Sequence, residues 1–262
     1  MEKAKATQTD PPPSSEPPAY RKPKHPIALR PEYIAPNNTT IHVKQHSASW
    51  SSGDFTVTSV PGPENPDPDP KPKELFKVLG ELASFSQRRY FRDADGLPLF
   101  ELSREKMGYK WFLHLPGEKE RNKDGKKGSS LFSSSSSSPS SSTSSSKAIA
   151  TIRSSYSTLK DKFEVSFRNA AVKNEEVTLE VRGQNVWKSL THVYYHGKLV
   201  MEITLKGMAA VYIPGKGPRW DVRVVEGVDL ALAAVITVII AATLYDSNSG
   251  LSNTGAPSSV SG

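Results

Sequence analysis

Two histidines, His192 and His196, have a spacing that could bind a metal ion. On a helix, residues four apart lie on one face, and two imidazoles there could chelate a transition metal. The residues between them are a valine and two tyrosines, which favour a strand. In a strand the same spacing separates the histidines by roughly 13 Å, so one strand cannot chelate through both. We therefore predict no metal site at these histidines.

The acidic sequence DADG at residues 93–96 resembles the start of an EF-hand calcium loop. That loop requires glycine at its sixth position and glutamate at its twelfth, and these positions are Pro98 and Arg104 here. Asp-Gly between two alternating apolar runs is instead a strong signal for a β-hairpin. We predict a hairpin turn at residues 93–96 and no bound calcium.

The sequence carries none of the catalytic motifs that would assign an enzyme class. It lacks G-x-S-x-G, the Walker A loop, G-x-G-x-x-G and H-E-x-x-H, and it contains no cysteine. Without cysteine there is no thiolate nucleophile, disulfide or cysteine metal site. We expect a non-enzymatic protein with no catalytic residue and no cofactor.

Six basic residues cluster in the sequence around the predicted hairpin and the strand that follows it. They are Arg88, Arg89, Arg92, Arg104, Lys106 and Lys110. On a folded meander such residues could form a patch that binds phosphoinositide headgroups. The alternative is that they are scattered charges that keep the surface soluble, and the sequence leaves both open.

Two short motifs near the N-terminus could bind protein partners. One resembles the K-x-T-Q-T peptide that dynein light chain binds as an added β-strand. Its residues are Lys5, Thr7, Gln8 and Thr9. The other reads P-P-x-Y, a WW-domain ligand whose preformed polyproline geometry lowers the cost of ordering. Its residues are Pro17, Pro18 and Tyr20. A proline-rich tail also produces P-P-x-Y by chance, so both partners are hypotheses.

The overall composition favours an intracellular protein. The chain has 262 residues and a formal net charge of +7, which is compatible with anionic headgroups but not diagnostic of them. The lack of cysteine fits a reducing compartment, and the first ten residues lack the apolar core of a signal peptide. Glu2 stands where N-myristoylation requires glycine. We expect a cytoplasmic monomer, peripheral at membranes, with no nucleic acid partner.

Low-complexity segments divide the chain into one domain and two tails. Residues 1–26 are proline-rich with few large aliphatics, and residues 247–262 are polar, so both are predicted to be disordered. Residues 27–246 form the predicted domain. Within it, the proline-rich residues 61–72 and the charged, poly-serine residues 117–146 are predicted to be flexible insertions.

Between these breaks, alternating apolar and polar residues predict about a dozen short strands followed by one helix. The predicted strands are residues 40–44, 55–60, 75–78, 89–91, 97–102, 110–114, 148–152, 163–167, 177–181, 192–195, 199–203, 211–213 and 220–224. Many short strands with turns between them are typical of a β-barrel or sandwich. The predicted fold class is therefore mainly β.

Residues 230–244 (LALAAVITVIIAATL) are apolar on every side, so as a helix they must be surrounded by lipid or by protein. The run has 15 residues, whereas a membrane span needs about 20. At about 1.5 Å per residue it would be roughly 23 Å long, the length of a seven-residue strand. We predict a helix capped by Asp229 and buried inside the β-structure. Its large aliphatic core residues are Leu230, Leu232, Val235, Ile236, Val238, Ile239, Ile240 and Leu244.

Several segments, in order along the chain, resemble the LURP-one-related family, which shares a fold with the tubby C-terminal domain and the phospholipid scramblases. They are residues 34–36, 41–45, 52–57, 75–78, 88–100 and 220–240. The resemblance covers about residues 27–246. It implies a barrel of about twelve antiparallel strands that encloses a central hydrophobic C-terminal helix.

We predict an adaptor-like role, in which the basic cluster of the barrel binds anionic phospholipid headgroups and the N-terminal tail binds protein partners. The alternative is a scramblase-like protein whose C-terminal helix inserts in the bilayer and moves lipids. The proline linker and the serine loop look like insertions relative to plant members of the family. The lipid and calcium residues of the tubby and scramblase branches find no clear motif in this chain.

Overall fold

The computed structural model describes the barrel and its helix but not every loop. The described residues are 19–46, 54–60, 71–81, 86–105, 110–117, 148–155, 162–185, 189–207 and 217–249. Side chains are described throughout these ranges except at residues 154–155 and 244–249.

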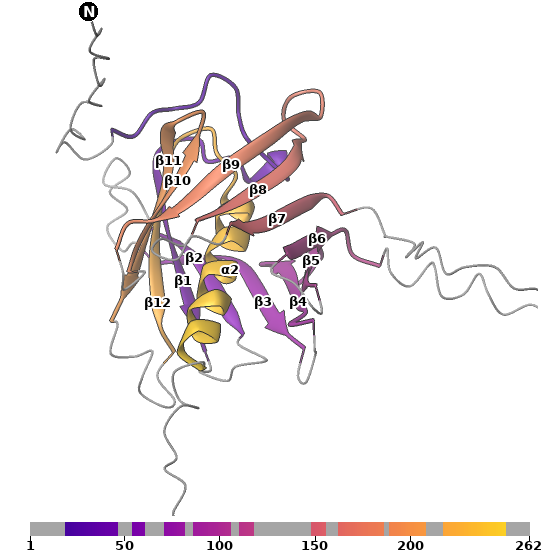
Figure 1. The fold of residues 1–262 in the computed structure, drawn as a ribbon. Coiled ribbons are helices and arrows are strands. Elements are labelled where there is room, and N and C mark those ends of the chain that lie inside the picture. The colour runs from indigo at the N-terminus through magenta and orange to yellow at the C-terminus, as the bar shows by residue number, and fades with distance from the viewer. Residues whose placement is uncertain are drawn as a thin grey trace, which may run out of the picture.

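Twelve antiparallel strands close into one barrel (Figure 1). They are β1 (Thr39–Gln45), β2 (Phe55–Val60), β3 (Lys73–Gly80), β4 (Arg89–Asp93), β5 (Pro98–Arg104), β6 (Lys110–His114), β7 (Ala150–Ser155), β8 (Lys162–Asn169), β9 (Glu175–Gly183), β10 (Leu190–Tyr195), β11 (Lys198–Lys206) and β12 (Arg219–Val224). Each strand pairs with the next one along the chain, and β12 pairs with β1 to close the ring. The predicted fold class is confirmed.

Alternation of apolar and polar residues decides which face each strand buries. In β1, Ile41 and Val43 are fully buried, and His42 between them points to the outside. In β8, Phe163, Val165 and Phe167 are buried in the same way. Because side chains alternate with a period of two, every second residue contributes to one core inside the barrel.

Twelve of the thirteen predicted strands coincide with strands of the barrel. The thirteenth, residues 211–213, lies outside the described residues. The clearest shift is in β7, which the sequence places at residues 148–152 and the structure at Ala150–Ser155.

The predicted hairpin between β4 and β5 is present. The Asp93 carboxylate accepts a hydrogen bond from the Leu97 N–H at 2.8 Å, and the Asp93 N–H donates to the Leu97 carbonyl at 3.0 Å. Gly96 has a φ of +85°, a left-handed conformation that glycine adopts without steric cost. Asp93 therefore supports the turn through its own carboxylate.

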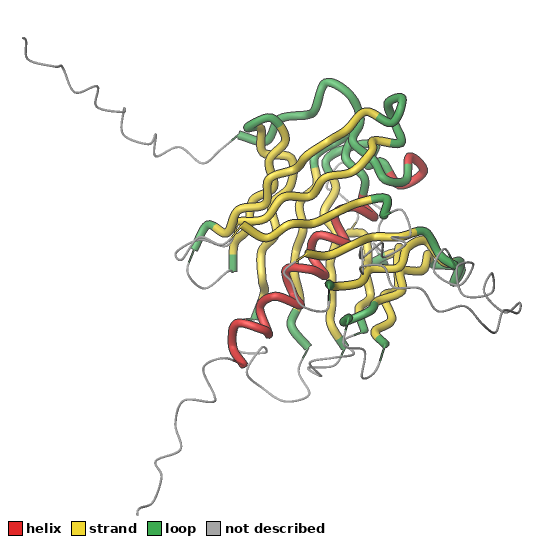
Figure 2. The backbone as a smooth tube through the Cα atoms, turned by 45° about the vertical axis from the view of Figure 1, so that its right-hand side comes forward, coloured by secondary structure: helices red, strands yellow, loops and turns green. Residues whose placement is uncertain are grey.

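The C-terminal helix α2 (Leu230–Ser249) runs through the interior of the barrel (Figures 1 and 2). Every residue from Leu230 to Ala242 is buried, which includes seven of the eight predicted core aliphatics. The side chain of the eighth, Leu244, is not among those described, and the helix continues five residues beyond it. No helix in the described ranges is both long and apolar enough to cross a membrane.

The N-terminal segment lies against the barrel before β1 begins. Ile27 forms a bridge with Val228, and a short 3-10 helix, η1 (Pro31–Tyr33), follows. Contacts with the barrel begin at Tyr20, before the predicted boundary at residue 26. This segment carries residues to two places on the barrel surface.

Candidate anion-binding site

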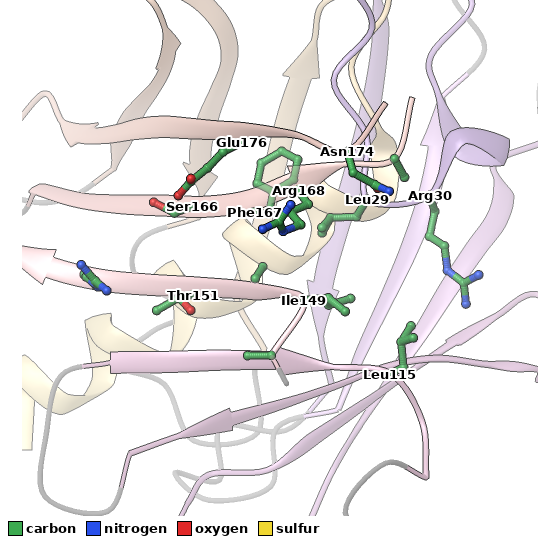
Figure 3. A pocket seen from close by; sticks show the side chains of 14 residues that line it. Leu29, Arg30, Leu115, Ile149, Thr151, Ser166, Phe167, Arg168, Asn174 and Glu176 are labelled. Atoms are coloured by element: carbon green, nitrogen blue, oxygen red, sulfur yellow. The ribbon is translucent and has the colours of Figure 1, made fainter. Parts of the chain in front are cut away.

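A cavity of about 610 Å³ lies where Leu29 and Arg30 meet strands β7, β8 and the start of β9 (Figure 3). Its described lining residues are Leu29, Arg30, Leu115, Ala148, Ile149, Ala150, Thr151, Arg153, Ser166, Phe167, Arg168, Ala170, Asn174 and Glu176. Because three of them are arginines, we call it the arginine pocket.

Neighbouring strands supply most of the polar wall. Thr151 of β7 is paired with Ser166 of β8. Arg168, two residues further along β8, lies across from Glu176 of β9. The apolar residues of β8 face the core, so Ser166 and Arg168 point outward. Arg153 follows Thr151 by two residues and shares its face of β7. Strand alternation thus places two arginines from different strands on one outer surface.

Asp229, the residue before α2, fixes the segment that carries Arg30. Its Oδ2 accepts hydrogen bonds from the backbone N–H groups of Leu29 and Arg30, each at 2.9 Å. Its Oδ1 accepts the Ala231 N–H at 2.7 Å, which is the helix cap that the sequence predicts. Burial raises the pKa of this carboxyl to about 6, although the backbone N–H groups act in the opposite direction. One buried carboxyl therefore ties the start of the helix to the pocket wall.

Asn169, at the end of β8, holds the same segment from the side of the barrel wall. Its Oδ1 accepts the Ala28 N–H at 3.0 Å and the Ala171 N–H at 3.1 Å. Its Nδ2 donates to the Pro26 carbonyl at 2.8 Å. Asn169 is only 3% exposed, so water does not compete effectively for these bonds. The position of Arg30 is therefore set by two buried side chains.

The pocket carries an excess of positive charge. Its described lining holds three arginines and one glutamate, a net charge of +2. Within the described part of the chain, no salt bridge joins Arg153 or Arg168 to a carboxylate. A guanidinium group can bind an anion in a bidentate manner.

The Arg30 side chain is held in place, but not all of its hydrogen-bond donors have a partner among the described residues. Its Nη1 lies 3.5 Å from the Glu32 carboxylate, and its Nη2 donates to the Leu99 carbonyl at 3.4 Å. The guanidinium lies 5.6 Å from the centre of the Phe100 ring. Its Nε is buried and has no hydrogen-bond partner among the described residues. A buried donor without a partner is costly, and an anionic oxygen would remove that cost.

Apolar side chains complete the wall. Leu29 and Phe167 are buried beneath the polar groups, and Leu115 is 38% exposed. Figure 3 shows Leu115 at the same end of the cavity as Arg30. The pocket therefore combines guanidinium groups with an exposed apolar side chain, an arrangement that suits an anion with an apolar part.

The Ser166 hydroxyl is engaged within the pocket. The Ser166 hydroxyl lies 3.0 Å from the Thr178 hydroxyl, so its hydrogen-bond partner is another hydroxyl. The described lining residues include no histidine or cysteine.

The predicted basic cluster is divided between the outside and the inside of the barrel. Arg88 is paired with the carboxylates of Glu81, at 3.5 Å, and Glu101, at 3.1 Å. Arg89 is 4% exposed, and its guanidinium lies 5.7 Å from the Trp111 ring. Arg104 lies 5.8 Å from the same ring. These three arginines have partners within the barrel.

The other members of that cluster differ in their surroundings. Arg92 is exposed and donates to the Gly96 carbonyl at 3.1 Å. Lys110 is exposed at the start of β6, and Lys106 lies outside the described residues. Lipid binding by this cluster stays a prediction.

The predicted tail motifs lie almost entirely outside the described residues. This applies to Lys5, Thr7, Gln8, Thr9, Pro17 and Pro18. Tyr20 is described, and it forms a bridge with Leu199 on the barrel.

The two histidines lie at different places. His192 is on β10, with its Nδ1 3.1 Å from the Tyr194 hydroxyl and its Nε2 3.4 Å from the Glu202 carboxylate. Burial lowers the pKa of His192, although Glu202 acts in the opposite direction. His196 is in the turn that follows, with a φ of +48°. In the described ranges no three histidine, cysteine, aspartate or glutamate residues are grouped to hold a metal ion.

Sequence reasoning did not find the arginine pocket. Arg30, Arg153 and Arg168 come from three separate segments, and the strand register and the Asp229 contacts place all three along the wall of one cavity. The available signal was the polar position of Arg153 and Arg168 in alternating strands, which places each on an outer face but does not show that they are neighbours.

The chain is a closed antiparallel barrel around one apolar C-terminal helix. The model of the LURP-one-related family matches residues 39–241, and the chain belongs to that family. The resemblance predicted from the sequence is confirmed. A solved structure of a protein from Arabidopsis thaliana is similar, with 16% sequence identity and a TM-score of 0.48; the match covers 85% of this chain and 98% of that one. No curated protein matches the chain.

Proposed function

We propose that this protein is a non-enzymatic binding module that recognises anionic phospholipid headgroups through the arginine pocket. The observation that carries the proposal is that Arg30, Arg153 and Arg168 all line one open cavity that has a single glutamate among its described lining residues. Guanidinium groups recognise phosphate oxygens bidentately, so the pocket suits a phosphate-bearing headgroup.

The apolar part of the pocket supports a lipid rather than a small soluble anion. Leu115 is 38% exposed and lines the same cavity as Arg30, so it could contact the acyl boundary while the arginines hold the headgroup. On this proposal the protein is a cytoplasmic monomer that associates peripherally with membranes. The helix α2 stays inside the barrel, and only the pocket surface contacts lipid.

The experiment compares two double variants that remove the same charge. One is Arg153→Ala/Arg168→Ala in the pocket, and the other is Arg92→Ala/Lys110→Ala, two exposed residues of the predicted basic cluster. Binding of the full chain is measured by co-sedimentation with vesicles of neutral lipid, with and without anionic phosphatidylserine or phosphoinositide, at about 0.15 M salt.

A basic residue near an anionic surface contributes about 1 kcal/mol, so the pocket variant should lose roughly thirtyfold in affinity. The control variant should lose little. Equal losses in both variants would mean non-specific attraction, and a loss confined to the control would place lipid binding at the predicted cluster. Either result overturns the pocket as the lipid site.

A further inference from the structure

The first described residues of the chain add a short strand-like contact to the outside of the barrel. Tyr20 forms a parallel bridge with Leu199, and the Arg21 N–H donates to the Leu199 carbonyl at 3.2 Å. The ladder between β11 and β12 begins at Met201, opposite Val224, and the Val225 N–H extends it by one bond to the Val200 carbonyl at 3.1 Å, which leaves Leu199 beyond it. The start of β11 therefore has a backbone edge that β12 does not cover, and the tail pairs there.

The Tyr20 side chain is held by two charged residues of opposite sign. Burial raises the pKa of Tyr20, the nearby Arg223 guanidinium lowers it and the nearby Glu202 carboxylate raises it, so both charged groups lie close to the tyrosine hydroxyl. These two residues are directly opposite each other on β11 and β12, with 3.6 Å between Arg223 Nη1 and Glu202 Oε1. A phenol can donate to one and accept from the other, so the pair is complementary to a tyrosine hydroxyl.

The following contact is weaker, because it is open to solvent. Lys22 Nζ lies 2.6 Å from a Glu226 carboxylate oxygen, with the two side chains 61% and 40% exposed. Tyr20 itself is 41% exposed. Exposed ion pairs contribute little, so this attachment can exchange with another partner.

Tyr20 is also the last residue of the P-P-x-Y motif at residues 17–20. A WW domain binds such a motif through aromatic grooves that take the proline and the tyrosine. The same tyrosine cannot be in that groove and against Glu202 and Arg223 at once.

We infer that the outer face of β11 and β12 is an intramolecular docking site for Tyr20, and that it competes with a WW-type partner for the P-P-x-Y motif. Only the undocked fraction of the chain binds the partner. The apparent dissociation constant is the intrinsic one divided by that fraction. If about one chain in ten is undocked, the full chain binds about tenfold more weakly than the free motif.

Docking is tested first, by hydrogen exchange of the full chain. The Arg21 amide should be protected in the wild type and should exchange faster in Glu202→Ala/Arg223→Ala, which removes both partners of Tyr20 without changing the net charge. The matched control is Glu180→Ala/Arg182→Ala, another glutamate–arginine pair on the outer face of β9. Protection that is absent in the wild type, or unchanged in the Glu202/Arg223 variant, refutes docking.

Competition is tested with a purified WW domain of the P-P-x-Y-binding class. A synthetic peptide of residues 10–26 should bind about tenfold more tightly than the full chain. The affinity of the Glu202→Ala/Arg223→Ala chain for the WW domain should approach that of the peptide. The affinity of the Glu180→Ala/Arg182→Ala chain should match that of the wild type. Equal affinities of peptide and wild-type chain, or a peptide that binds no WW domain, refute the competition.

Discussion

Asp229 provides the sharpest test of how the helix and the pocket wall are joined. The substitution Asp229→Asn keeps the size and shape of the side chain but removes its charge. In the structure the carboxylate accepts three backbone N–H groups, two on Oδ2 and one on Oδ1. An asparagine has only one oxygen, so its NH₂ must face at least one of these donors. Each buried donor left unpaired costs about 1–3 kcal/mol.

The pH dependence of this loss follows from the pKa. Burial raises the pKa of Asp229 from 3.8 to about 6, so the folded protein binds a proton more tightly than the unfolded chain does. About two pKa units correspond to about 3 kcal/mol. This contribution to stability is fully present below pH 3.8 and is lost as the pH rises through about 6. The free energy of unfolding of the wild type should therefore rise relative to that of the Asp229→Asn variant as the pH is lowered.

The assay is urea unfolding of both proteins at several pH values between 7 and 4, followed by tryptophan fluorescence. The difference in free energy of unfolding between wild type and variant should grow by about 2–3 kcal/mol towards pH 4. The control Asp95→Asn, at an exposed residue of the β4–β5 turn, should show no such growth. A constant difference would refute a desolvated carboxyl. A difference that shrinks towards pH 4 would mean that the N–H groups outweigh burial.

Three further predictions concern stability. Ile236→Ala, in the middle of α2 and fully buried, should lower the free energy of unfolding by about 2–5 kcal/mol in urea, because the barrel cannot close on the cavity. Gly96→Ala should cost about 1 kcal/mol in the same assay, since φ is +85° and no atom within 4 Å opposes the new methyl group. Asn169→Ala should cost about 2–4 kcal/mol and raise hydrogen exchange at Ala28, because one buried and two partly buried hydrogen bonds are lost; an unchanged Ala28 amide would contradict that role.

The elements that the sequence predicts well are those whose signal is local. The run at residues 230–244 is apolar all round, and only burial on every side accommodates it, so the central helix could be foreseen. The hairpin at Gly96 follows from Asp-Gly between two alternating runs. Features that depend on contacts between distant segments were not predicted. The register of β7 on β8 decides that Arg153 and Arg168 share a surface, and no short segment encodes it.

The placement of Arg89 could have been foreseen from the same alternation. Arg89 and Phe91 are two residues apart in one strand, so a buried Phe91 takes Arg89 to the inner face with it. Grouping basic residues by their proximity in the sequence ignored this period of two. Arg92, one residue beyond Phe91, is exposed for the same reason.

The N-terminal segment contacts the barrel at two sites, and the contacts at one site are more deeply buried than those at the other. Between Ile27 and Arg30 the chain is held by Asp229 and Asn169, both almost fully buried, and these hydrogen bonds are protected from water. At Tyr20 and Lys22 the contacts are half-exposed and few. Release of the tail breaks only the exposed contacts, because the buried anchors lie between Tyr20 and the pocket along the chain. Arg30 therefore keeps its position in the arginine pocket whether or not the tail is docked.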